Sequence, residues 1–219
     1  MSLLAINGSP RGRLSNTKRL IEYFTKDIPP SIVTVIHLKE FYDSNNYQSI
    51  IKEIKKHDSI LIGFPLYADW TPGFVKELFE EMGKHQKIYR GKQFLYLIQC
   101  GFPESLHCRY AERYCERFSK RIGGNYKGSI IRGGSEGARF IPKKFFKDAQ
   151  RLAELGKMFE NEGELDQTLL KAIAKPEKLS GFRLFWMKIM LKFSFSNLYW
   201  NSQLKKNGVY ENRFDKPYC

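Results

Sequence analysis

Short apolar runs alternate with amphipathic segments along the first 131 residues of the chain. Runs rich in β-branched and aromatic residues predict five buried strands, at 3–6, 32–36, 59–63, 94–100 and 129–131. Between them, apolar side chains recur at helical spacing, which predicts helices at 17–26, 47–56, 72–82 and 108–121. Strand and helix therefore follow one another in regular alternation.

Regular alternation with short connections implies a parallel sheet that is covered by helices on both faces. Five such units in about 160 residues fit the doubly wound, flavodoxin-like α/β order, in which ligands bind beyond the carboxyl ends of the strands. We therefore predict a ligand-binding domain over 1–160. The remainder, 161–219, is predicted to be a helical extension that packs on the domain or at a dimer interface.

Composition narrows the class of protein only a little. The 219 residues are 42% hydrophobic, and 37 Lys and Arg against 23 Asp and Glu give a net charge of +14. Such a charge attracts phosphate cofactors, nucleic acid and anionic lipid alike, and excess lysine also aids solubility. We expect no nucleic-acid partner and, from the ligand spacing, no metal. The four sparse cysteines and the absence of a signal-peptide pattern predict a cytoplasmic protein with reduced thiols.

A polar loop follows the first strand and reads Asn-Gly-Ser-Pro-Arg-Gly-Arg-Leu-Ser-Asn-Thr over 7–17. A phosphate group needs many short donors and little steric bulk. Two glycines permit a tight turn, and the following helix presents unpaired backbone N–H groups and the positive end of its dipole. The loop is therefore a candidate phosphate site formed by Ser9, Arg11, Ser15, Asn16 and Thr17. The alternative is an ordinary loop in which Ser15 or Asn16 caps the helix.

Neither a P-loop nor a Gly-x-Gly-x-x-Gly dinucleotide motif is present. The polar loop instead resembles the Gly-Ser-Pro-Arg…Ser-Asn-Thr segment of the NAD(P)H-dependent FMN reductase family, which has the flavodoxin-like fold. The resemblance extends over about residues 2–137. It implies that this loop holds the phosphate of FMN.

The segment 64–73, after the third strand, combines aromatic residues with two prolines and a glycine. Flat apolar surface and exposed backbone suit a planar ring, although a lone Tyr or Trp more often packs onto the sheet. The segment resembles the family's Pro-x-Tyr-x-Gly-x-x-Pro-Gly flavin loop. This implies ring contacts from Pro65, Leu66, Tyr67, Ala68 and Asp69. Phe64 and Asp69 depart from the family pattern, and a carboxylate near the ring would lower the flavin potential.

The segment after the fourth strand reads Cys-Gly-Phe-Pro-Glu over 100–104 and resembles a Gly-Phe-Pro-Glu turn of one branch of the family. The resemblance implies that the flavin ring is bordered by Cys100, Gly101, Phe102 and Glu104. Glu104 either caps the next helix, accepts a hydrogen bond at the site or is solvated. The segment 133–137 also resembles a family loop, and a plain flexible turn explains it equally well.

The resemblance implies an FMN-dependent NAD(P)H oxidoreductase. It would pass hydride through flavin N5 to a small acceptor such as a quinone, a nitro or azo compound or a flavin. Because the cofactor carries the difficult chemistry, we assign no catalytic side chain. Two alternatives stay open: a non-catalytic flavodoxin-type electron carrier, although such carriers are small and acidic, and a membrane-associated flavin-binding module.

Large apolar side chains crowd the segment 182–200, in which Lys188, Lys192 and Ser196 form a narrow polar stripe. The pattern predicts one helix that is apolar over most of its circumference and must be covered. An arginine and two lysines make it too charged to span a membrane. It suits a subunit interface or an interfacial position on a membrane. Since flavin reductases of this fold are commonly dimers, the resemblance favours a homodimer.

Overall fold

The computed structural model describes residues 1–44, 46–136, 138, 146–192 and 195–216. Gly137, part of the predicted family loop, and Cys219 therefore lie outside the described residues. The chain forms two compact units, Met1–Lys178 and Leu179–Cys219, and each is described by itself.

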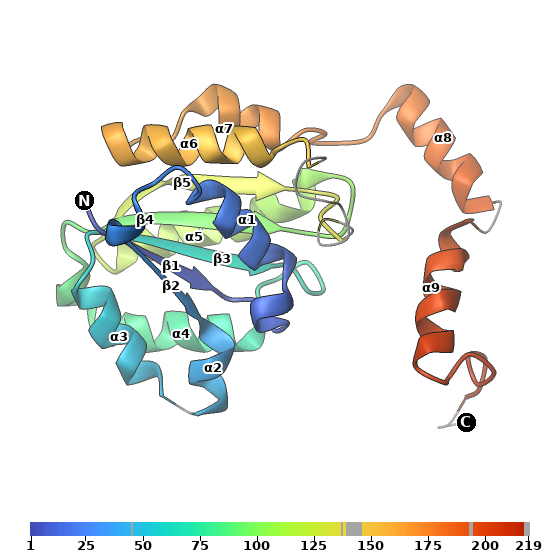
Figure 1. Ribbon diagram of the computed structural model, residues 1–219, viewed down its shortest axis with the longest axis horizontal. Helices are drawn as coiled ribbons and strands as arrows, with labels where there is room; N and C mark the ends of the chain where they lie inside the picture. Colours follow the sequence, from blue (N-terminus) through green and yellow to red (C-terminus); the bar gives the residue numbers. More distant parts are fainter. Residues whose placement is uncertain (45, 137, 139–145, 193–194, 217–219) are drawn as a thin grey trace. The chain divides into compact units, whose positions relative to one another are not determined.

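The first unit is built on one sheet of five parallel strands, in the order β2-β1-β3-β4-β5 (Figure 1). The strands are β1 (Leu3–Asn7), β2 (Val33–His37), β3 (Ser59–Pro65), β4 (Gln93–Gln99) and β5 (Asn125–Arg132). This order confirms the predicted doubly wound, flavodoxin-like α/β fold. Strand β5 begins four residues before the predicted Ser129. The prediction missed this first half because it is only partly buried and carries no apolar run.

Seven α-helices are described in the first unit. They are α1 (Asn16–Phe24), α2 (Leu38–Asp43), α3 (Tyr47–Lys55), α4 (Gly73–Gly83), α5 (Arg109–Arg121), α6 (Ala149–Glu162) and α7 (Gln167–Ile173). The four helices predicted between strands are confirmed, each end lying within two residues of its predicted position. Helix α2 was not predicted, because six residues are too few to show helical periodicity.

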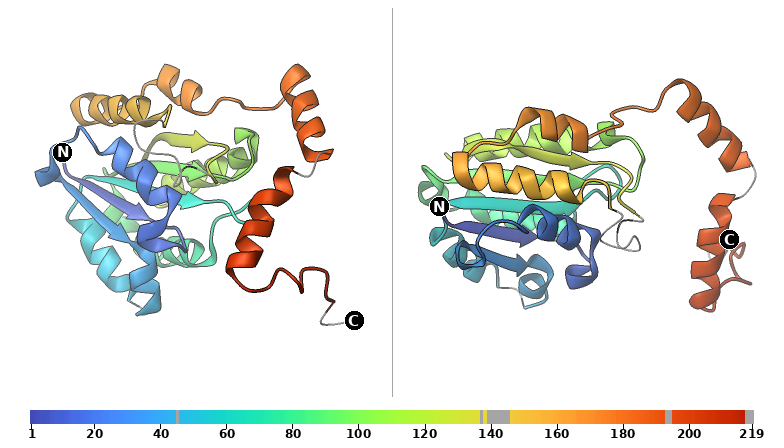
Figure 2. Two further views of the ribbon diagram at one scale, coloured as in Figure 1. Left: turned by 45° about the vertical axis from the view of Figure 1, so that its right-hand side comes forward. Right: turned by 45° about the horizontal axis from the view of Figure 1, so that its top comes forward.

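Helices cover both faces of the sheet (Figures 1 and 2). On one face, α1 and α6 bury Phe24 and Phe159 against strand residues such as Leu3 and Leu61. The two helices approach closely at Gly156, where a Cβ atom would lie 1.8 Å from the carbonyl oxygen of Phe24. Alternate strand residues point to the other face, which α3, α4 and α5 cover.

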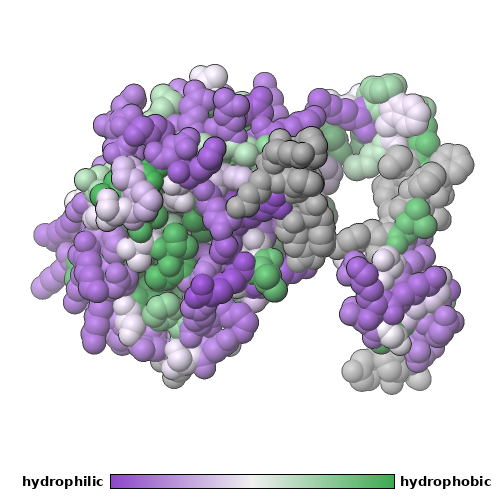
Figure 3. Space-filling model, in the orientation of Figure 1, coloured by the Kyte–Doolittle hydropathy of each residue, from purple (hydrophilic) through white to green (hydrophobic). Residues whose placement is uncertain are grey.

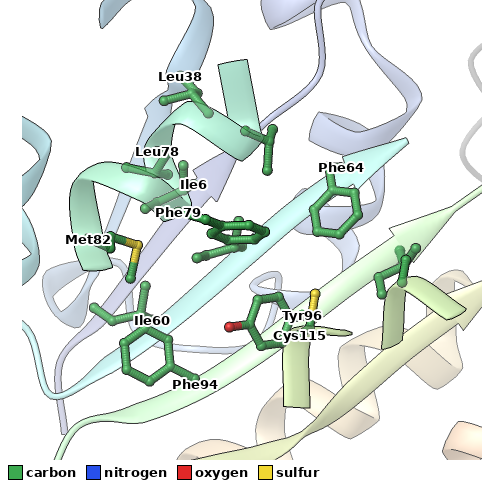
Figure 4. Close-up of a cluster of buried hydrophobic side chains, with 14 of the residues drawn as sticks. Ile6, Leu38, Ile60, Phe64, Leu78, Phe79, Met82, Phe94, Tyr96 and Cys115 are labelled. Atoms are coloured by element: carbon green, nitrogen blue, oxygen red, sulfur yellow. The ribbon is translucent and has the colours of Figure 1, made fainter. Parts of the chain in front are cut away.

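Phe64 belongs to this second face, where Figure 4 shows its ring beside those of Phe79 and Tyr96. The ring is fully buried and meets Phe79 edge-on, with 6.4 Å between the ring centroids. Cys115 of α5 lies in the same cluster and is also fully buried. Phe64 therefore fills the core with its side chain, although it belongs to the segment predicted to contact the flavin.

The second unit contains α8 (Gly181–Lys192) and α9 (Phe195–Lys206). The prediction of one helix over 182–200 is therefore wrong; residues 193 and 194 lie outside the described residues. Apolar residues occur on nearly all sides of the segment, so its periodicity defines no boundary. In Figure 3 the described residues over α8 are mostly hydrophobic, and hydrophilic residues predominate over α9. No described helix is long and apolar enough to cross a membrane.

Candidate flavin site

The loop after β1 is organised by the side chain of Asn7, the last residue of that strand. Its amide Nδ2 donates to the carbonyl oxygen of Gly12 at 2.8 Å and to Nδ1 of His37 at 3.0 Å. Its Oδ1 accepts from the backbone N–H of Ser9 at 3.2 Å and from the hydroxyl of Ser15 at 3.3 Å. Gly12, with φ of +52°, turns the chain back toward Asn7. One buried amide thus sets the shape of the predicted phosphate loop.

His37 lies beneath this loop in its neutral form. Because the Asn7 amide can only donate, Nδ1 of His37 accepts, and the ring proton is on Nε2. Burial, followed by the charge of Arg13, holds the pKa of His37 below its usual value of 6.5. The loop therefore depends on an uncharged imidazole.

The predicted phosphate ligands gather around the N-terminus of α1. Ser15 caps this helix by accepting a hydrogen bond from the backbone N–H of Lys18 at 3.0 Å, so the capping interpretation is confirmed for Ser15. Thr17 is fully buried, and its hydroxyl accepts from the Gln99 amide at 3.3 Å. A phosphate role for Ser9, Arg11, Ser15, Asn16 and Thr17 stays a prediction.

Glu136, in the loop after β5, contacts residues at the same end of α1. Its carbonyl oxygen accepts from the Asn16 amide at 3.1 Å, and its carboxylate forms an ion pair with Arg11 at 3.4 Å. Both charged side chains are more than 40% exposed, so a bound phosphate could compete with the carboxylate for Arg11. The segment 133–137, which contains Glu136, resembles a family loop, but the contact of Glu136 with Arg11 was not predicted, because 125 residues separate the two.

The loop after β3 contains a tight two-residue turn. Tyr67 and Trp70 exchange backbone hydrogen bonds of 2.8 and 3.0 Å, and the turn residues Ala68 and Asp69 have φ of +47° and +61°. Both angles are in the left-handed region, which glycine normally occupies in such turns. Tyr67 and Asp69 are exposed at the tip. The turn holds the backbone of the predicted ring-binding residues in a fixed, strained shape.

Other residues of this segment anchor it to the domain. Pro65 ends β3 and is buried, and the backbone N–H of Leu66 donates to the carbonyl oxygen of Gln99 at 2.8 Å. Trp70 packs edge-on against Tyr114 of α5, with 5.1 Å between the ring centroids. Flat surface for a ring is thus offered at the tip by Tyr67 rather than by Trp70.

The loop after β4 carries Cys100, Gly101, Phe102 and Glu104. Cys100 is buried, and the Cys108 thiol donates a hydrogen bond to it, which lowers the pKa of Cys100. Phe102 is 52% exposed. Glu104 begins a short 3₁₀ helix, Ser105–Cys108, without forming a side-chain cap. The capping alternative for Glu104 is therefore wrong.

His107 connects this loop with the turn after β3. Its Nδ1 lies 3.2 Å from Oδ1 of Asp69, and its ring stacks on Phe102 with 4.4 Å between centroids. Its Nε2 lies 3.8 Å from Oε2 of Glu104. Asp69, Phe102 and Glu104 were all predicted site residues, whereas the place of His107 among them was not predicted, because Asp69 and His107 are far apart along the chain. In the part of the chain that the structure describes, no group of three His, Cys, Asp or Glu could hold a metal ion.

Backbone hydrogen bonds hold these loops against neighbouring strand ends and against one another at the carboxyl edge of the sheet. The N–H of Gly8 donates to the carbonyl oxygen of Gly63 at 2.6 Å, and that of Gly134 donates to Phe102 at 2.5 Å. A Cβ at Gly133 would lie 2.9 Å from the carbonyl oxygen of Pro103. A helix N-terminus with hydroxyl and guanidinium groups suits a phosphate, and exposed Tyr67 and Phe102 suit a flat ring. The residues present therefore fit FMN.

Comparison with known proteins agrees with this arrangement. The chain belongs to the NADPH-dependent FMN reductase family, whose model matches residues 1–113. It is an NAD(P)H-dependent flavin oxidoreductase, with FMN as cofactor and NAD(P)H as co-substrate. No curated protein sequence matches the chain.

Solved structures share the fold at low sequence identity. General stress protein 14 from Treponema denticola, solved in complex with FMN, is 19% identical with a TM-score of 0.57, over 74% of this chain and 98% of that protein. An NADPH-quinone reductase from P. pentosaceus is 19% identical with a TM-score of 0.51, over 83% of this chain and all of that one. An FMN-dependent NADH-azoreductase from Bacillus anthracis is 15% identical with a TM-score of 0.53, over 74% of this chain and 100% of that protein.

Proposed function

We propose that the protein transfers hydride from NAD(P)H, through N5 of bound FMN, to a small acceptor such as a quinone, a nitro or azo compound or a flavin. The observation that supports this most is the meeting of the loops after β1, β3, β4 and β5 at one edge of the sheet. Two solved structures with the same fold carry the names of a quinone reductase and an azoreductase. The acceptor would enter the pocket from which the oxidised nicotinamide leaves.

The residues that would hold FMN divide by chemistry. The phosphate would lie on the N-terminus of α1, where backbone N–H groups and the helix dipole favour an anion. Its side-chain contacts would come from Ser9, Arg11, Ser15, Asn16 and Thr17. The ring would lie along the backbone of Pro65, Leu66, Tyr67, Ala68 and Asp69, bordered by Cys100, Gly101, Phe102 and Glu104. When bound, FMN supplies the hydride chemistry, and the protein orients the ring and excludes water.

Asp69 bears on the redox behaviour of such a site. A carboxylate close to the ring opposes the negative charge of reduced flavin and so lowers its potential. Here the carboxylate is 3.2 Å from an imidazole nitrogen and well exposed, and both features weaken its field at the ring. We therefore expect Asp69→Asn to raise the flavin potential only modestly.

The visible spectrum of the purified protein and an anaerobic stopped-flow experiment test the function together. We expect an oxidised-flavin spectrum that bleaches rapidly on addition of NADPH or NADH and returns when a quinone or azo compound is added. Bound flavin that neither nucleotide bleaches would contradict the reductase and favour the flavodoxin-type electron carrier. A protein that binds no FMN would contradict both.

We also propose that the protein works in the cytoplasm as a homodimer, with the segment 182–200 at the subunit interface. The support is the exposure of large apolar side chains within the second unit, among them Phe182, Phe185, Trp186, Leu198 and Trp200. Water-exposed apolar surface of this extent is typical of an interaction site. Attachment to an anionic membrane surface is the second possibility, since the unit is also basic.

A further inference from the structure

We propose that His107 donates the proton that a quinone needs when it acts as the acceptor at this site. The inference rests on the proposed function, since it assumes that FMN lies between the loops after β3 and β4. Reduction of a quinone by hydride produces an oxyanion, which must take up one proton. A side chain that can act as a general acid within reach of the oxyanion is the usual source.

The position of His107 meets the first requirement of a proton donor, a fixed ring. Asp69 contacts Nδ1 at 3.2 Å from one loop, and Phe102 stacks on the imidazole at 24° between ring planes from the other. The Asp69 carboxylate forms an ion pair with the ring once His107 is protonated, so it stabilises the imidazolium that must give up the proton. The proton that comes and goes is then the one on Nε2.

The second requirement is a nitrogen that an acceptor can reach. Nε2 is 3.8 Å from Oε2 of Glu104, a distance that allows an ion pair with the protonated ring but is too long for a hydrogen bond. The His107 side chain is 31% exposed, so both an acceptor and water can approach it. Phe102, beside it, is 52% exposed and offers a flat apolar surface on which a quinone ring could lie. Of the four histidines in the chain, only His107 lies in the loops after β3 and β4.

The step balances without a further reactant. Hydride brings both electrons to the quinone, and the product oxyanion forms an O–H bond while the Nε2–H bond of the imidazolium breaks. Hydroquinone and neutral imidazole result, and solvent water returns the proton to the ring. An acceptor that takes electrons without a proton, such as ferricyanide, has no need of His107.

The experiment compares the wild-type holoenzyme with His107→Gln and His107→Asn. Each protein is reduced with NADPH under anaerobic conditions and reoxidised in a stopped-flow instrument with p-benzoquinone or with ferricyanide. His85→Gln is the matched control, because His85 also contacts a carboxylate, Glu81, at 3.3 Å but lies beyond the C-terminal end of α4. Titration of the apoprotein with FMN, followed by flavin fluorescence, gives a readout that is independent of turnover.

We expect the two His107 variants to lose on the order of 10²-fold in the rate of reoxidation by the quinone, the usual contribution of a general acid. Their rates with ferricyanide, their reduction by NADPH and their affinity for FMN should match the wild type, as should every rate of His85→Gln. Unchanged quinone rates would overturn the proposal, as would equal losses with quinone and ferricyanide, which indicate a structural role. If the wild-type flavin is reduced by neither NADPH nor NADH, the proposed function fails. If it is reduced but not reoxidised by the quinone, only this inference fails.

Discussion

At the scale of single residues, the neutral His37 couples the phosphate loop to pH. Its pKa is lowered in the folded protein, so between the unfolded value of 6.5 and the lower folded value the unfolded chain binds more protons. We therefore predict that stability falls as the pH falls through this window. Protonation would also turn Nδ1 into a donor that faces the donating amide of Asn7.

Urea unfolding of wild type and His37→Gln, at several pH values between 8 and 5, measures this effect. Glutamine keeps an acceptor for Asn7 and does not titrate, so the variant should lose part of the pH dependence. An identical slope in both proteins would show that other groups cause it. Titration with FMN at the same pH values should show a steeper loss of affinity in the wild type than in His37→Gln, since the phosphate of FMN itself takes up a proton at about pH 6 in both proteins.

Ala68 is the second residue with a predictable effect. Its φ of +47° is in the left-handed region, and its side chain is exposed. Ala68→Gly removes a conformational cost and loses little burial, so we expect about 0.5–1 kcal/mol of added stability. Thermal unfolding is the measurement. Gly91→Ala is the opposite control: φ there is +80° with open space around the position, and the substitution should destabilise by about 1 kcal/mol.

At the scale of elements, the loop and helix α1 act together on the cofactor. We predict that Arg11→Ala with Ser15→Ala weakens FMN binding without unfolding the domain, because each lost contact costs on the order of 1–3 kcal/mol. Ser15→Ala also removes the cap of α1, worth about 1 kcal/mol of stability. Fluorescence titration of the apoprotein with FMN is the measurement.

The matched control for the lost cap is Asn46→Ala. Asn46 caps α3 by accepting from the backbone N–H of Ser49 at 3.3 Å, away from the predicted phosphate loop. This variant should lose similar stability and keep its affinity for FMN. Equal FMN affinity in the double variant and in Asn46→Ala would show that Arg11 and Ser15 do not bind the phosphate.

The helices and strands could be predicted from local sequence patterns. Residues such as Ile50 and Ile54 repeat at helical spacing, and Leu3 to Ile6 form an unbroken apolar run, so local sequence is enough to predict the helix and the strand.

The site could be predicted from the sequence only in part. Glycine and polar residues after strands mark where loops meet a ligand, but the Asp69–His107 and Arg11–Glu136 contacts arise from tertiary structure and leave no local pattern.

At the scale of the whole molecule, the unit Leu179–Cys219 differs from the flavodoxin-like domain in its composition and charge. It holds 10 aromatic residues among 41, together with seven basic and two acidic ones, a net charge of +5. Because of this positive charge, two copies of the unit repel one another electrostatically, while their apolar side chains favour association. An anionic membrane would instead attract the unit.

Salt therefore separates the two possibilities. We predict that the full-length protein is a dimer and that the dimer is favoured by raising the ionic strength from 0.01 to 0.15 M, since the Debye length shrinks from about 30 to about 8 Å. Trp186→Glu and Leu198→Glu, which place carboxylates on exposed positions of α8 and α9, should yield monomers that keep FMN affinity. Tyr42→Glu, on the exposed surface of α2, is the matched control and should stay dimeric. Sedimentation equilibrium gives the mass. A monomer that binds anionic vesicles at low salt and leaves them at high salt would refute the dimer and assign the second unit to a membrane surface.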